Sequence, residues 1–125
     1  MNRTYTDRRP RAERRSHARF DRSLEVHGTA EPGGVVARMV ANDLSLGGLY
    51  CSSSLDFPEM TRLAVRLMLP ERRSGAVEPL DVEAVVVRHR EISSTLGSGR
   101  YELALFFAGM SDAQREKLAR FLALA

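Results

Sequence analysis

Apolar and polar side chains alternate with a period of two over three segments of the chain, residues 61–69, 80–90 and 101–107. In the first of these segments the apolar residues on one side are Leu63, Val65, Leu67 and Leu69. Successive side chains of a β-strand point to opposite faces, so this pattern is typical of strands with one buried face. The pattern predicts three strands, separated by loops at 70–79 and 93–99.

The first half of the chain carries three shorter segments that we also predict to be strands. They lie near residues 18–28, 35–40 and 49–53. The first two are separated by Glu31-Pro32-Gly33-Gly34, a turn sequence in which proline fixes the entry and glycine supplies positive φ. A polar stretch with two glycines, residues 42–48, separates the second from the third. The chain is therefore expected to contain six strands.

The last segment, residues 111–125, changes to a helical period. Ser111 and Gln114 have the spacing of a capping box, in which each side chain binds a free backbone N–H at the helix start. The apolar residues that follow with helical spacing are Leu118, Phe121, Leu122 and Ala125. Six strands can close into a barrel that leaves no exposed edge, and a helix can cover one end. The expected fold class is all-β with a C-terminal helix, built as a small six-stranded antiparallel β-barrel.

The positive charge of the chain is concentrated at its N-terminus. The 125 residues suit one domain, and the net charge of +3 is unevenly distributed. Residues 1–22 contain eight arginines, no lysine and three acidic residues, while residues 23–125 have a net charge of −2. We expect a flexible arginine-rich arm over 1–17 and a barrel domain over 18–125. Charge alone does not distinguish a nucleotide, a nucleic acid, an anionic lipid or an acidic protein as the partner.

Several classes of protein are disfavoured by the sequence. No apolar run approaches the roughly 20 residues of a membrane helix, and the N-terminus lacks the apolar stretch of a secretory signal, so we expect a cytoplasmic protein without membrane insertion. The single cysteine and the scattered histidines do not have metal-ligand spacing. The chain has no phosphate-binding loop of the G-x-x-x-x-G-K-[ST] type and no placed catalytic triad. We therefore expect neither an enzyme nor a bound metal or cofactor.

Two polar clusters fall at predicted strand boundaries, where a rigid scaffold can present side chains to a ligand. The first is Arg14-Arg15-Ser16-His17-Ala18-Arg19, between the arm and the first strand. The second is Asp43-Leu44-Ser45-Leu46-Gly47-Gly48, between the second and third strands. Arginine carries a planar fork of donors that can bind a phosphate or a guanine edge in a bidentate manner.

Together the clusters resemble the signature of the PilZ domain family, R-x-x-x-R followed by [DN]-x-S-x-x-G. Arg15 and Arg19 match the first motif, and Asp43, Ser45 and Gly48 match the second. The order, the spacing and the predicted elements agree with the family over roughly residues 11–123. The resemblance implies a PilZ-like β-barrel that binds the bacterial second messenger cyclic di-GMP.

The residue types suit that ligand, which has two phosphates and two guanines. Arg15 and Arg19 would share the phosphates and the O6 and N7 acceptors of guanine. Asp43 accepts hydrogen bonds only and complements the guanine N1–H and N2–H₂ donors. Ser45 would contact a phosphate or the exocyclic amine. Gly48 would allow a close approach of backbone and ligand, or a positive φ at the strand entry.

The resemblance also implies a signalling mechanism. In the family the arginine segment acts as a switch that wraps onto the barrel around the ligand, and an arginine at the position of Arg14 favours a stacked pair of ligands. We expect a stand-alone receptor, without an attached output domain, that signals in trans to an unidentified downstream protein. One alternative is an adapter of the same fold that does not respond to nucleotide, although such members usually lack the arginine pair.

A third possibility is a small barrel that binds RNA or DNA through its basic arm. Barrels that bind single strands usually offer several aromatic stacking platforms. This chain has no tryptophan and only 6% aromatic residues, so nucleic acid is disfavoured as the partner.

Two single residues are given structural roles. Cys51 is expected to pack as a small apolar residue. Arg88 lies late in the segment 80–90, whose neighbours could face a ligand, and a surface salt bridge is its expected role.

Overall fold

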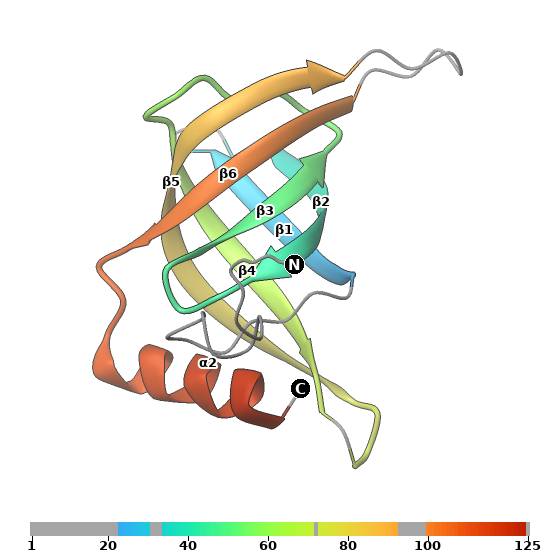
Figure 1. Ribbon diagram of the computed structural model, residues 1–125, viewed down its shortest axis with the longest axis vertical. Coiled ribbons are helices and arrows are strands. Elements are labelled where there is room, and N and C mark those ends of the chain that lie inside the picture. Colours follow the sequence, from blue (N-terminus) through green and yellow to red (C-terminus); the bar gives the residue numbers. More distant parts are fainter. Residues whose placement is uncertain (1–22, 31–33, 72, 93–99, 125) are drawn as a thin grey trace, which may run out of the picture.

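The computed structural model of the chain describes residues 23–30, 34–71, 73–92 and 100–124. These residues form β1 (Leu24–Ala30), β2 (Val36–Leu44), β3 (Gly48–Ser53), β4 (Arg62–Pro70), β5 (Val77–Ile92), β6 (Arg100–Ala108) and the helix α2 (Asp112–Leu124). The strands form a closed barrel in the order β1-β2-β3-β6-β5-β4, and every neighbouring pair is antiparallel. The helix lies at one end of the barrel and the β3–β4 loop at the other (Figure 1). The expected fold class is confirmed.

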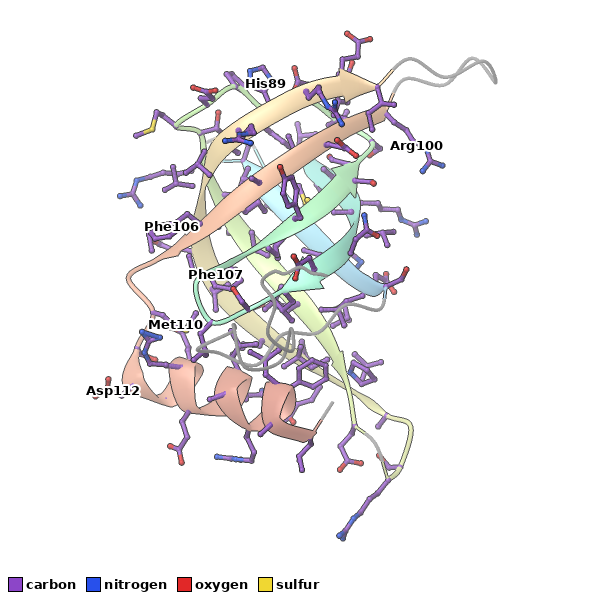
Figure 2. The ribbon with its side chains drawn as sticks, viewed as in Figure 1. His89, Arg100, Phe106, Phe107, Met110 and Asp112 are labelled. Atoms are coloured by element: carbon purple, nitrogen blue, oxygen red, sulfur yellow. The ribbon has the colours of Figure 1, made fainter. Side chains whose placement is uncertain are left out.

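Alternate side chains of all six strands fill the barrel. The four apolar residues of β4 that were expected on one side, from Leu63 to Leu69, are each at most 4% exposed. The neighbours Phe106 and Phe107 lie on opposite sides of β6 (Figure 2), with exposed fractions of 59% and 7%. Burying one large apolar side chain contributes roughly 1.5–3 kcal/mol, so this two-residue period is the main source of the barrel's stability.

β5 begins at Val77, so the predicted loop over 70–79 is wrong at its C-terminal end. Among the described strands, β4 pairs with β1 only up to Leu67, and β5 pairs with β6 only from Glu83. The β4–β5 hairpin therefore extends past the barrel as a two-stranded ribbon. Proline has no N–H to donate and is tolerated in such an edge position, which explains how Pro79 lies inside a strand.

Two other strands are longer than the sequence indicates. β1 continues past Gly28 to Ala30, because its last residues pair with β2 on one side and β4 on the other. β2 runs to Leu44, so the polar stretch that begins at Asn42 starts inside the strand and not after it. β3, β4 and β6 each lie within one residue of their predicted bounds. The predicted loop at 93–99 lies outside the described residues.

The helix begins with the predicted capping box. The Ser111 N–H donates to Oε1 of Gln114 at 2.7 Å, and the Gln114 N–H donates to Oγ of Ser111 at 3.1 Å. Leu118 and Leu122 are 0% and 4% exposed and join the barrel core. The predicted helix over 111–125 is thus confirmed from Asp112 to Leu124, and residue 125 lies outside the described part.

Cys51 packs in the core as expected. It is 1% exposed, and its thiol lies 3.8 Å from Sδ of Met39. Burial raises the pKa of the thiol to about 12, against a smaller lowering by a backbone hydrogen bond at Leu103. None of the described helices is both long and apolar enough to cross a membrane.

Candidate functional site

The cluster Asp43–Gly48 occupies the end of β2, a tight turn and the start of β3, at the α2 end of the barrel (Figure 1). The Ser45 N–H donates to the Gly48 carbonyl at 2.9 Å. The Phe107 N–H donates to the Gly47 carbonyl at 2.9 Å and ties the turn to β6. The turn is therefore held on both sides by backbone hydrogen bonds.

The Ser45 hydroxyl is held only weakly inside this turn. Its Oγ accepts from the Gly47 N–H at 3.3 Å and donates to the Gly48 carbonyl at 3.4 Å. Both distances are at the long end for hydrogen bonds. A hydroxyl has one donor and two acceptor positions, so Ser45 can turn toward a ligand at little cost.

A β-bulge between Ala41 and Asp43 directs the carboxylate of the cluster outward. The buried residues of β2 are Ala37, Met39 and Ala41, and then Leu44. The alternation of buried residues along β2 therefore shifts by one position after Ala41. Asn42 is the extra residue of a β-bulge, in which two residues of one strand lie opposite a single residue of its partner. Asp43 is partly exposed and pairs with Tyr50 of β3, which is 44% exposed. The bulge is why a strand with a buried face can present Asp43 on its outer side.

Gly48 is required by the packing of two strands. A Cβ at this position would lie 2.1 Å from the carbonyl oxygen of Leu105 in β6. Its φ is not among the positive values found at Gly34, Gly75 and Gly109. The expectation of a positive φ at Gly48 is therefore wrong. The backbone of Gly48 does make a close approach, and the structure shows it against β6.

Asp43, Ser45 and Gly48 lie at the end of β2, in the turn and at the start of β3, respectively. Arg14, Arg15 and Arg19 lie outside the described residues, as does the expected arm over 1–17. The meeting of the two clusters stays a prediction.

The outer surface beside the cluster carries charged side chains that are mostly paired. Arg90 of β5 forms an ion pair with Glu102 of β6, and that hydrogen bond raises the pKa of the Arg90 guanidinium. His89 lies toward the opposite end of the barrel (Figure 2) and pairs with Asp56 of the β3–β4 loop at 3.0 Å. Arg88 is exposed and has no salt bridge to any other described residue. Within the described part, the expected surface salt bridge of Arg88 is not found.

Tyr50 is a residue of this surface that the sequence analysis did not single out. Leu49 and Cys51 are buried on either side of it, so alternation alone could have assigned Tyr50 to the outer face. Its pairing with Asp43 depends on the bulge, which the sequence does not reveal.

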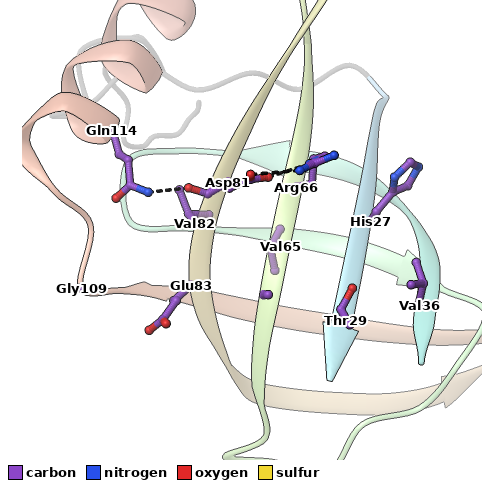
Figure 3. A pocket seen from close by; sticks show the side chains of 11 residues that line it. His27, Thr29, Val36, Val65, Arg66, Asp81, Val82, Glu83, Gly109 and Gln114 are labelled. Atoms are coloured by element: carbon purple, nitrogen blue, oxygen red, sulfur yellow. Dashed lines mark hydrogen bonds and ion pairs between the residues drawn. The ribbon is translucent and has the colours of Figure 1, made fainter. Parts of the chain in front are cut away.

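A shallow hollow of about 670 Å³ lies elsewhere, over β1, β4, β5 and the start of α2 (Figure 3). Its charged groups largely engage one another. Arg66 binds both carboxylate oxygens of Asp81, at 2.7 and 3.1 Å, and this hydrogen bonding lowers the pKa of Asp81. His27 contacts Glu25 at 2.7 Å. None of the predicted site residues lines this hollow, and we do not assign the site to it.

A comparison with family models matches residues 13–124 to the PilZ domain. The search of curated proteins gave no significant match. Among solved structures, the inhibitor of motility MotI/DgrA of Bacillus subtilis has a TM-score of 0.66 at 22% identity, covering 93% of this chain and 55% of that one. The PilZ domain of YcgR from Escherichia coli, solved with c-di-GMP, has a TM-score of 0.64 at 18% identity, covering 89% and 90%.

MrkH of K. pneumonia has a TM-score of 0.68 at 17% identity, covering 94% of this chain and 50% of its own. The chain thus spans about half the length of MotI/DgrA and MrkH and most of the YcgR domain. These likenesses show that the barrel is the same fold. The match of the family model over nearly the whole chain, with the closed barrel and its terminal helix, shows that the chain belongs to the PilZ domain family.

Proposed function

We propose that this chain is a receptor for cyclic di-GMP, which binds on the outer face of the barrel at the β2–β3 turn. The observation that carries the proposal is the bulge that directs Asp43 outward beside the weakly held Ser45 hydroxyl. The family supports the same ligand, since the related YcgR was solved in complex with c-di-GMP.

The chemistry of the site favours guanine. The Asp43 carboxylate accepts from the N1–H and N2–H₂ of the base, a pair of donors that adenine lacks. Arg15 and Arg19 contribute guanidinium forks to the O6 and N7 edge and to the phosphates. Ser45 contacts a phosphate or the exocyclic amine. Gly48 contributes indirectly, because its lack of a side chain lets the turn lie close against β6.

The strength of binding can be placed on a rough scale. Charge-assisted hydrogen bonds contribute roughly 1.5–3 kcal/mol each. Four or five of them contribute roughly 6–15 kcal/mol in total. A net binding free energy of about −8 kcal/mol after the cost of ordering the arm corresponds to a micromolar dissociation constant.

Signalling follows from the use of two segments far apart in the sequence. The arm over 1–17, with Arg15 and Arg19 at its junction with the barrel, closes over the ligand only when nucleotide bridges it to Asp43 and Ser45. Arg14 favours a second, stacked ligand. We propose that the new position of the arm is recognised in trans by a partner protein.

Calorimetric titration of the full chain tests the ligand and the residues together. Cyclic di-GMP should bind, and its adenine analogue should not. Arg19→Ala and Asp43→Ala should each weaken binding by about tenfold or more, since each removes a charge-assisted bond, with little change in thermal stability.

Two controls separate the site from general charge. Glu59→Ala removes an exposed carboxylate from the loop at the opposite end of the barrel, and Arg115→Ala removes an exposed arginine from α2. Both should bind as wild type. Tight binding to a mixed oligonucleotide alone, with a steep salt dependence, would replace the proposal with nucleic-acid binding. The absence of any nucleotide binding would indicate the adapter role.

A further inference from the structure

The barrel has a second bulge, in β5, that matches the one in β2. The register of β5 against β6 shifts between Val86 and Arg88. Val86 is buried, whereas Val87 is 47% exposed and Arg88 is exposed. This bulge therefore leaves two successive side chains on the outer face, as the β2 bulge does for Asn42 and Asp43. Bulges often redirect side chains next to functional sites.

The two bulges bring four residues into one row across four strands. Asp43 of β2 pairs with Tyr50 of β3, Tyr50 pairs with Ala104 of β6, and Ala104 pairs with Arg88 of β5. Leu103 and Leu105 are buried, so Ala104 lies on the outer face with its row partners. The row begins at the carboxylate of the proposed site and ends at a cation.

Arg88 differs from Arg62 and Arg90 in having no ion pair within the described part of the chain. Arg90 pairs with Glu102, and Arg62 pairs with Glu83 at 3.5 Å. Arg88 has no such partner among the described residues. A guanidinium without a carboxylate partner can bind an external ligand without first breaking an ion pair.

The dimensions of the row suit a dinucleotide. Adjacent strands lie about 4.8 Å apart, so the backbones at Asp43 and Arg88 are separated by roughly 14 Å, or three strand spacings. Ala104 has only a methyl group between Tyr50 and Arg88, and the long arginine side chain can extend over it toward a ligand.

We propose that Tyr50 and Arg88 complete the nucleotide site on the outer face of β3, β6 and β5. Tyr50 stacks on the guanine that Asp43 holds, and Arg88 donates to O6 and N7 of the second guanine. This inference rests on the proposed function, because it requires that cyclic di-GMP is the ligand. It extends the site past the motif residues and makes the recognition specific for both bases.

The tyrosine part is tested by titrating the full chain with cyclic di-GMP. Base–aromatic stacking predicts that Tyr50→Leu weakens binding by about tenfold, while Tyr50→Phe retains the ring and binds as wild type. The chain has no tryptophan and three tyrosines, so stacking should also quench its tyrosine fluorescence. Tyr50→Phe should bind cyclic di-GMP with the affinity of wild type but show less quenching of tyrosine fluorescence, because the contribution of Tyr50 is removed.

The arginine part is tested with a second ligand, cyclic GMP–AMP, in which adenine replaces one guanine. Adenine offers N7 as an acceptor but N6 as a donor, so an arginine fork cannot bind both positions. Wild type should therefore prefer cyclic di-GMP. In Arg88→Ala and Arg88→Lys this preference should fall by about tenfold.

Arg73→Ala is the matched control, because this exposed arginine lies in the β4–β5 turn, about eleven residues of strand, or roughly 36 Å, from Arg88. It should retain the wild-type preference. If wild type binds cyclic di-GMP and Asp43→Ala does not, but the Tyr50 and Arg88 variants bind and discriminate as wild type, this inference is wrong and the receptor function stands. If wild type itself does not bind, both are wrong.

Discussion

At the start of β3, Gly48 lies so close to β6 that no side chain fits between the two strands. A Cβ there would meet the Leu105 carbonyl oxygen at 2.1 Å, with the Leu105 carbonyl carbon at 3.1 Å. Both are backbone atoms, which cannot rotate away as a side chain can. The glycine of the motif is therefore needed for folding whether or not a ligand binds.

We expect Gly48→Ala to lower the free energy of unfolding by about 1–3 kcal/mol or more, because the strands must separate to admit the methyl group. Urea denaturation measures this loss. Gly47→Ala is the neighbouring control, since its Cβ would meet only Oγ of Ser45 at 3.9 Å, and it should remain near wild-type stability. Equal stabilities of the two variants would contradict the close approach of β3 and β6.

Some residues of the proposed site can be predicted from the sequence, and others cannot. Asp43, Ser45 and Gly48 form a local motif whose spacing is visible in the sequence. Tyr50 and Arg88 carry no motif and become neighbours of the site only through the register of four strands. Register depends on bulges, and a bulge is a single extra residue whose position local periodicity does not mark.

Among the elements, those with strict two-residue alternation were predicted closely. In β3, β4 and β6, every second residue is buried or partly buried along the strand without a bulge. β2 departs from its prediction because Asn42 and Asp43 both lie outward, so that its polar end resembles a loop. β5 departs because its first three residues, Val77 to Pro79, are all exposed and so show no alternation of burial.

The helix start offers a test at this scale. Besides its part in the capping box, the Gln114 side chain donates from Nε2 to the Asp81 carbonyl and so joins α2 to β5. Ser111→Ala should lower the free energy of unfolding by about 1 kcal/mol, the typical cost of losing an N-cap. Gln114→Ala should cost more, because it also leaves that carbonyl without this donor.

Thermal denaturation of both variants and of Arg115→Ala measures these effects. Arg115 follows Gln114 but has an exposed side chain with no ion pair among the described residues, so its variant should melt as wild type. If Gln114→Ala were no less stable than Ser111→Ala, the contact between α2 and β5 would contribute nothing.

For the whole molecule, the barrel acts as a rigid scaffold for one surface. Its interior is filled by apolar side chains from every strand, so specificity is confined to the outer face and to the segments that reach it. We propose that the arginine segment and the β2–β3 turn, far apart in the chain, enclose one cyclic di-GMP site.

Hydrogen exchange of the full chain, with and without cyclic di-GMP, tests this claim most directly. We predict slower exchange over residues 8–20 and 43–48 together when cyclic di-GMP is added, and no change with the adenine analogue. Equal exchange of both segments with and without cyclic di-GMP, or protection confined to the hollow over β1, β4 and β5, would contradict it.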